Sequence, residues 1–164
     1  MDILMYVNFT LVGLLGAAAL RWGAGPEKVC AAALVLVTLV DPIYHILVRY
    51  PVFETVDTGH LVMDASVAAA FIAVALGANR VYPLWLAAFQ LVSLLSHFAR
   101  DLTEVLPMLA YGLMSYGPYY IILLILAGGI ATHARRAKTL GPYRSWRNSS
   151  PRSQAPAPRS RPTG

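Results

Sequence analysis

The chain has 164 residues, of which 57% are hydrophobic and 13% are charged, and its net charge is +5. A soluble domain carries about 25% charged residues, so this composition excludes an ordinary water-soluble protein and predicts an integral membrane protein. The single cysteine, Cys30, excludes an intramolecular disulfide and CxxC redox chemistry.

Five apolar runs follow one another along the chain. Because about 20 apolar residues span a bilayer as a helix, we expect membrane helices at about 3–20, 29–48, 61–78, 81–98 and 107–134. If the first run is a cleaved signal peptide, four helices remain, although its leading "MD" lacks the usual positive charge. The sequence therefore predicts an all-α membrane bundle over residues 1–138.

The second run contains an acid, Asp41, with His45 four residues later. A charged residue at mid-bilayer costs at least ~2.5–3.5 kcal/mol, so Asp41 should face protein, water or a ligand. Pro42 disfavours the helical conformation of the residue before it, so we expect a bend or a break at Asp41.

The third run opens with His60 and Asp64 and then has small residues at every fourth position. Such a stripe allows close helix packing, so we expect this helix to be central, with His60 and Asp64 facing the second or fourth helix. The same stripe could instead serve a homo-oligomer or a partner membrane protein. Its members are Ala65, Ala69, Ala73 and Gly77.

The fourth run is joined to the third by Asn79 and Arg80 alone, which predicts a tight antiparallel hairpin. One face of this helix is polar, because polar residues recur at three- and four-residue spacing. They are Gln90, Ser93 and His97, followed by Asp101.

The segment "ANRVYPLWLAAFQLVSLLSHFARDL" (78–102) has a short basic turn, then Pro–Leu–Trp, then a helix that ends in His. In this pattern it resembles segments of small bacterial polytopic membrane proteins of uncharacterised function. The resemblance covers about a sixth of the chain. It implies a bacterial inner membrane and implies no activity, cofactor or substrate.

The fifth run contains Pro118, which should kink the helix, and Tyr119, which we expect to line a polar pocket. Residues 139–164 have no acid and are rich in Pro, Ser and Arg, which predicts a disordered tail. Basic residues beside the membrane should bind anionic lipid, and their place next to a span argues against nucleic acid. This predicted lipid-surface anchor consists of Arg135, Arg136, Lys138, Arg144 and Arg147.

The distribution of charge predicts the orientation. With the C-terminus in the cytoplasm, 11 Lys and Arg residues lie inside, and only Arg49 and Arg100 lie outside. Of the eight acids, only Glu27 is then on the inner side. We therefore expect the N-terminus outside and the C-terminus inside.

In this orientation three Asp–His pairs with four-residue spacing reach the outer side of the membrane. They are Asp41–His45, His60–Asp64 and His97–Asp101. Such spacing puts two residues on one helix face, where they could simply satisfy each other. Together, three imidazoles and the carboxylates could bind a transition metal or another small ligand. Haem between His45 and His97 is a lesser alternative.

The sequence assigns no catalytic residue and leaves open whether the protein is an enzyme. Zinc-bound water at the outer site could serve hydrolysis. Asp41 and His45 could instead handle protons, although the inner halves of the helices are nearly free of polar groups. The alternative from another class is a small structural, assembly or holin-like pore protein, in which the Asp–His pairs only satisfy one another.

Overall fold

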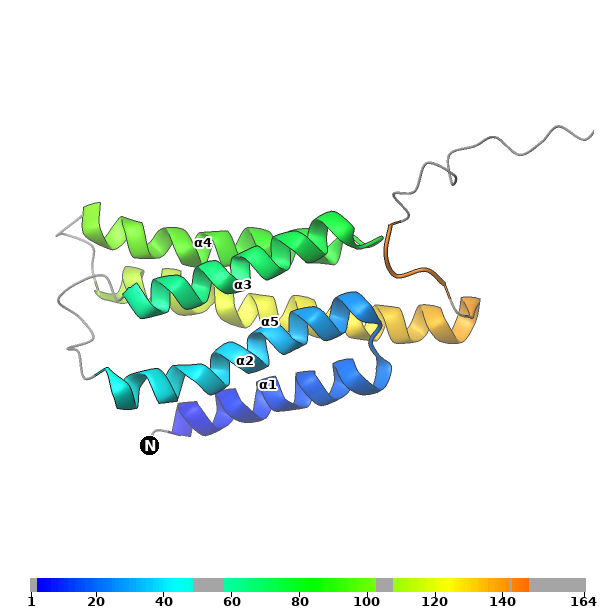
Figure 1. Ribbon diagram of the computed structural model, residues 1–164, viewed down its shortest axis with the longest axis horizontal. Coiled ribbons are helices and arrows are strands. Elements are labelled where there is room, and N and C mark those ends of the chain that lie inside the picture. Colours follow the sequence, from blue (N-terminus) through cyan, green and yellow to red (C-terminus); the bar gives the residue numbers. More distant parts are fainter. Residues whose placement is uncertain (1–2, 49–57, 103–107, 142, 148–164) are drawn as a thin grey trace, which may run out of the picture.

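The computed structural model describes residues 3–48, 58–102, 108–141 and 143–147. These residues form a bundle of five helices that run up and down beside one another (Figure 1). The helices are α1 (Ile3–Trp22), α2 (Gly25–Leu47), α3 (Thr58–Gly77), α4 (Tyr82–Leu102) and α5 (Met108–Leu140). The predicted all-α membrane bundle is confirmed.

Four of these helices, α1, α2, α3 and α5, are long and apolar enough to cross a membrane. They leave many large apolar side chains exposed, among them Leu14, Leu36 and Leu124 at more than 60%. A patch of this kind is unsuited to water and is covered by lipid. Polar residues of α4 lower its hydropathy, but Gln90 and Ser93 are buried inside the bundle.

Helix α2 is continuous through Pro42, and α5 is continuous through Pro118. The break expected at Asp41 is therefore absent. A proline inside a helix removes one backbone donor and leaves the rest of the helical hydrogen bonds in place. As a result Asp41 and His45 lie one turn apart on the same regular helix.

The core runs through the middle of the bundle and is apolar. Its largest fully buried side chains include Phe71 of α3, Leu86 of α4, and Ile122 and Leu126 of α5. Cys30 of α2 is completely buried in the same core, where it packs as a small apolar residue. The buried polar residues outside this core include Glu27 near the start of α2 and Gln90 and Ser93 of α4.

Most of the stripe of small residues on α3 does not pack inside the chain, although Gly77 lies against Trp146. Three of its members, Ala65, Ala69 and Ala73, are exposed on the surface of the bundle. The core of α3 is instead formed by the opposite side, where Val67 and Phe71 are buried. Bulk does not decide which face is inside, because Ala68 and Ala75 are also buried while Val62 and Leu76 are exposed, as expected where lipid is as apolar as the core.

We call the end of the bundle near Ile3 the N-terminal end, and the opposite end, where α5 finishes, the tail end (Figure 1). At the tail end α5 stops at Leu140, and Gly141 has a left-handed φ of 74°, the usual conformation just after a helix. The chain then turns back, and residues 143–147, which we call the strap, lie against the bundle.

The strap pairs with the short connection between α3 and α4. Asn79 N donates to Ser145 O at 3.1 Å, and Arg147 N donates to Gly77 O at 2.8 Å. Residues 139–147 were expected to belong to a disordered tail, but they comprise the last turn of α5, Gly141 and this paired strap. Residue 142 and the remainder of that tail, 148–164, lie outside the described residues.

Candidate metal site at the N-terminal end

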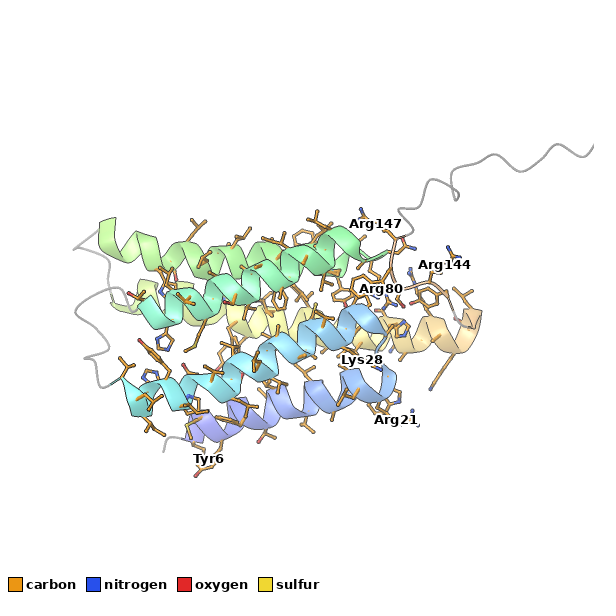
Figure 2. All side chains as sticks on the ribbon, in the orientation of Figure 1. Tyr6, Arg21, Lys28, Arg80, Arg144 and Arg147 are labelled. Atoms are coloured by element: carbon orange, nitrogen blue, oxygen red, sulfur yellow. The ribbon has the colours of Figure 1, made fainter. Side chains whose placement is uncertain are left out.

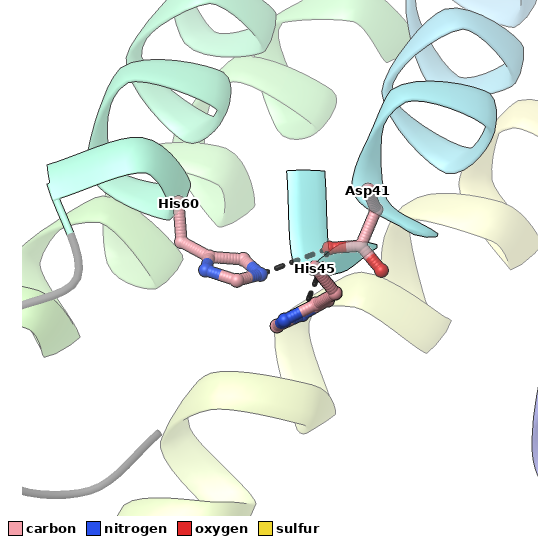
Figure 3. Close-up of side chains that lie close together, drawn as sticks. All are labelled: Asp41, His45 and His60. Carbon is pink, nitrogen blue, oxygen red and sulfur yellow. Dashed lines mark hydrogen bonds and ion pairs between the residues drawn. The ribbon is translucent and has the colours of Figure 1, made fainter. Parts of the chain in front are cut away.

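Three potential metal ligands meet at the N-terminal end of the bundle. Asp41 and His45 extend from α2, and His60 reaches across from the first turn of α3 (Figure 3). His60 Nε2 lies 2.9 Å from Asp41 Oδ1, and His45 Nε2 lies 3.7 Å from the same oxygen. One ligand atom of each residue lies within 4.8 Å of the others, so the group could hold a metal ion.

An aromatic contact orients the two imidazoles. The ring of Tyr44 packs edge-on against both His45 and His60, with centroid separations of 5.8 and 5.4 Å. The imidazoles themselves are 4.9 Å apart. Tyr44 can approach α3 this closely because residue 59 is glycine, since a Cβ at Gly59 would overlap the tyrosine ring.

A second polar cluster lies one helical turn further along α3. The carboxylate of Asp64 accepts hydrogen bonds from three residues of α4: from Gln90 at 3.0 Å, from Ser93 at 3.3 Å and from His97 at 2.9 Å. Gln90 and Ser93 are themselves buried. This cluster fixes α3 against α4 and therefore fixes the helix that carries His60.

The pairing differs from the expectation of three pairs within helices. His60 and Asp64 of α3 bond to different neighbours, His60 to Asp41 of α2 and Asp64 to His97 of α4. Among the described residues, only Asp41 and His45 form a pair at four-residue spacing, and it is the longer contact. The side chain of Asp101 lies outside the described part. His60 and Asp64 bond to residues of the adjacent helices, and not to each other, because α3 lies between α2 and α4, as expected.

Tyr119 belongs to a separate polar contact. Its hydroxyl donates to Asn8 Oδ1 at 2.6 Å and so joins α5 to α1. Of the three residues expected to support the site, Gln90 and Ser93 contact the Asp64 cluster and Tyr119 does not. No sequence pattern links Asn8 with Tyr119, because the two residues are far apart in the chain.

Sequence reasoning missed a buried ion pair at the tail end. Glu27, the completely buried acid of α2, forms an ion pair with Arg80 from the turn before α4. Arg80 also bonds to His133 at 2.9 Å and to Ser145 at 3.2 Å. The sequence did contain a sign of this pair. Glu27 is the lone acid predicted on the cytoplasmic side, and Arg80 is the lone cation of the turn between the third and fourth helices.

The strap completes this tail-end network. The guanidinium of Arg80 lies 5.3 Å from the centre of the Tyr143 ring, and the Tyr143 hydroxyl bonds to Nδ1 of His133 at 2.8 Å. The cations of the predicted lipid anchor, Arg135, Arg136, Lys138, Arg144 and Arg147, are all exposed. Figure 2 shows the labelled ones at this same end of the bundle.

The two ends of the bundle have different chemistry. At the tail end the buried carboxylate of Glu27 is already neutralised by a guanidinium. At the N-terminal end the side chains of Asp41, His45 and His60 are 45%, 40% and 30% exposed, so an ion can reach them. Two imidazoles and one carboxylate form a donor set typical of zinc and non-haem iron.

No protein-family model, curated protein or solved structure matches this chain.

Proposed function

We propose that this protein is a polytopic membrane protein that binds one divalent transition metal through Asp41, His45 and His60. The observation that carries the proposal is the convergence of three ligand atoms from two helices to within 4.8 Å. Zinc and ferrous iron suit this donor set best, because both accept imidazole and carboxylate together.

Two of the three separations between ligand atoms are close to those of a metal site. Two ligand atoms bound to a tetrahedral zinc at 2.0–2.1 Å lie about 3.3 Å from each other. The two distances to Asp41 Oδ1, 2.9 and 3.7 Å, bracket that value. The hydrogen between His60 Nε2 and Asp41 Oδ1 occupies the space where a metal would bind, so metal binding would replace a proton.

Three protein ligands leave at least one coordination position open. Structural zinc sites are normally closed by four protein ligands, whereas sites that exchange or act on a small ligand keep a position for water. The partial exposure of all three side chains supports such an open site. The Asp64 cluster supports the metal site because it holds α3, and therefore His60, in place.

We further propose that the protein lies in a bacterial inner membrane with the tail end in the cytoplasm. The described cations at the tail end include Arg21, Lys28, Arg80 and the helix-end residues of α5, whereas Asp41 and Asp64 belong to the N-terminal end. This distribution agrees with the excess of positive charge on the cytoplasmic side of membrane proteins. The metal would then come from outside the cytoplasm.

The test is metal analysis and an absorption spectrum on one sample of the full-length chain purified in detergent. Zinc or iron at about one ion per chain, and a lower melting temperature after chelation, would support the proposal. A Soret band would instead indicate haem, for which His45 and His97 were the candidates, and would contradict it. A metal-free sample that binds no added zinc, and whose melting temperature does not change after chelation, would also contradict the proposal.

The alternative is a small structural, assembly or holin-like protein without a metal. One observation favours it: each of Asp41 and Asp64 already has an imidazole partner at 2.9 Å, so both carboxylates are satisfied without an ion. Expression of a pore protein should cause dye leakage from cells. Leakage that persists in the Asp41→Asn variant, together with a metal-free sample, would favour this alternative.

A homo-oligomer is also part of the proposal, because small residues of α3 face outward. Ala65, Ala69 and Ala73 are exposed, and they would let a second copy approach closely. Replacing Ala69 by Leu should block this contact and shift the detergent-solubilised protein toward the monomer in sedimentation. An unchanged mass would contradict this part.

A further inference from the structure

A groove separates α1 from α5 near the tail end of the bundle. Its volume is about 230 Å³, it is open to the outer surface of the bundle, and its walls are almost entirely apolar. The α1 wall consists of Leu15, Ala18 and Trp22, which share one helix face because they are three and four residues apart.

On the α5 side, the residues that line the groove are followed along the helix by two cations. Two rows with four-residue spacing line the groove, Ala127–Ala131 and Ile130–Ala134. One further step of four residues along each row reaches Arg135 and Lys138. An apolar groove and two cations therefore follow one another along the same face of α5.

The α1 side adds a third cation next to the last groove residue of that helix. Arg21 directly precedes Trp22, and its guanidinium lies 6.0 Å from the centre of the Trp22 ring. Among the residues that the structure describes, the ion pairs of carboxylates involve His45, His60, Arg80 and His97. Arg21, Arg135 and Lys138 are exposed and take no part in them.

The dimensions of the groove fit one hydrocarbon chain. Leu15 and Trp22 are seven residues apart, which corresponds to about 10 Å along the helix. One leaflet of the bilayer core is about 15 Å thick, half of the ~30 Å total. A groove of this length would cover roughly two thirds of a leaflet, and if it ended at the headgroups the cations beyond it would meet a phosphate.

We propose that this groove is a binding site for one phospholipid with an anionic headgroup. An acyl chain would lie between α1 and α5, and Arg21, Arg135 and Lys138 would bind the headgroup phosphate. Small side chains at Ala18, Ala127, Ala131 and Ala134 provide the room. The site shares no residue with the metal site, because the groove is lined by α1 and α5 and the metal ligands belong to α2 and α3.

Native mass spectrometry of the full-length chain can test this site. The protein in detergent is titrated with phosphatidylglycerol and with phosphatidylcholine that carry identical acyl chains. We expect one phosphatidylglycerol to be retained per chain, with clear preference over phosphatidylcholine. Equal retention of the two lipids would overturn the proposal, because it would indicate ordinary contact with surrounding lipid.

Two variants separate the groove from its cations. Ala131→Phe fills the groove and should abolish retention, whereas Leu124→Phe, on an exposed part of the same helix, should leave it unchanged. The double variant Arg135→Gln/Lys138→Gln should bind about thirtyfold more weakly, the equivalent of ~2 kcal/mol for two cations. Arg144→Gln is its matched control. Equal behaviour of a variant and its control would overturn the proposal.

Free phosphate is the remaining competitor for the three cations. Millimolar inorganic phosphate should not displace the retained lipid, because the acyl chain supplies much of the binding. Displacement by phosphate alone would show an anion site without a lipid and would contradict the proposal.

Discussion

Nε2 of His60 lies 2.9 Å from Oδ1 of Asp41, and this contact joins the first turn of α3 to the last two turns of α2. Asp41 lies six residues before Leu47, the last residue of α2, or roughly 9 Å from the helix end. A carboxylate at that depth must have a partner. Its partner from another helix is an imidazole, and a second imidazole, that of His45, is close by.

Replacing Asp41 by Asn should weaken zinc binding by more than the 10–100-fold that is typical for loss of an outer-shell partner. The variant removes the one anionic ligand and leaves both imidazoles. Competition with a chromophoric chelator measures the affinity. Thr38→Val, one turn earlier on α2, serves as the control and should keep the affinity of the wild type. Unchanged affinity in Asp41→Asn would contradict a role as ligand.

Replacing Asp64 by Asn should lower the thermal stability of the bundle clearly but should change its metal content only slightly. Three donors of α4 converge on this carboxylate, and a hydrogen bond to a charged group contributes about 1.5–3 kcal/mol. Thermal unfolding in detergent should show coupling between Asp64→Asn and His97→Gln. The pair Asp64→Asn and His133→Gln should be additive, since these residues belong to opposite ends.

Replacing Glu27 by Gln should destabilise the protein by about 3–5 kcal/mol, because Arg80 would be left buried without its carboxylate partner. The double variant Glu27→Leu/Arg80→Leu should lose much less, since no unpaired charge remains. The midpoint of denaturant unfolding compares the two. A double variant as unstable as Glu27→Gln would argue against an ion pair as the main contribution of these residues.

Replacing Gly25 by Ala should loosen the strap. A Cβ at Gly25 would lie 2.5 Å from Nε1 of Trp146, so the indole would have to move. We expect trypsin to cleave after Arg144 several-fold faster, because cleavage requires local opening of the strap. Gly13→Ala is the matched control, since a Cβ there meets nothing within 4 Å. Equal cleavage rates in the two variants would contradict the close packing of Trp146.

The helices could be predicted from the sequence because hydrophobic length alone nearly specifies a membrane helix. The predicted run 61–78, for example, became α3, Thr58–Gly77. The outward-facing stripe of Ala65 and Ala69 could not be predicted. In a bundle surrounded by lipid, apolar residues occupy both the inner and the outer faces, so periodicity does not tell which face is buried.

Of the predicted ligands, the structure brings Asp41, His45 and His60 together and places Asp64 and His97 in a second cluster. Spacing along one helix identified Asp41 and His45, which do lie near each other. It could not show that His60 would reach across to α2 while Asp64 bonds to α4, because this depends on how α3 is rotated between its neighbours. The Glu27–Arg80 pair was missed for the same reason.

The central claim is that two of the four histidines, His45 and His60, bind a metal together with Asp41. Zinc stoichiometry of the desalted full-length protein in detergent tests it directly, measured for the wild type and for His→Gln at each histidine. We expect about one zinc per chain in the wild type, in His97→Gln and in His133→Gln, and a loss of zinc in His45→Gln and His60→Gln. Zinc that persists in both His45→Gln and His60→Gln, or is absent from the wild type, would contradict the claim.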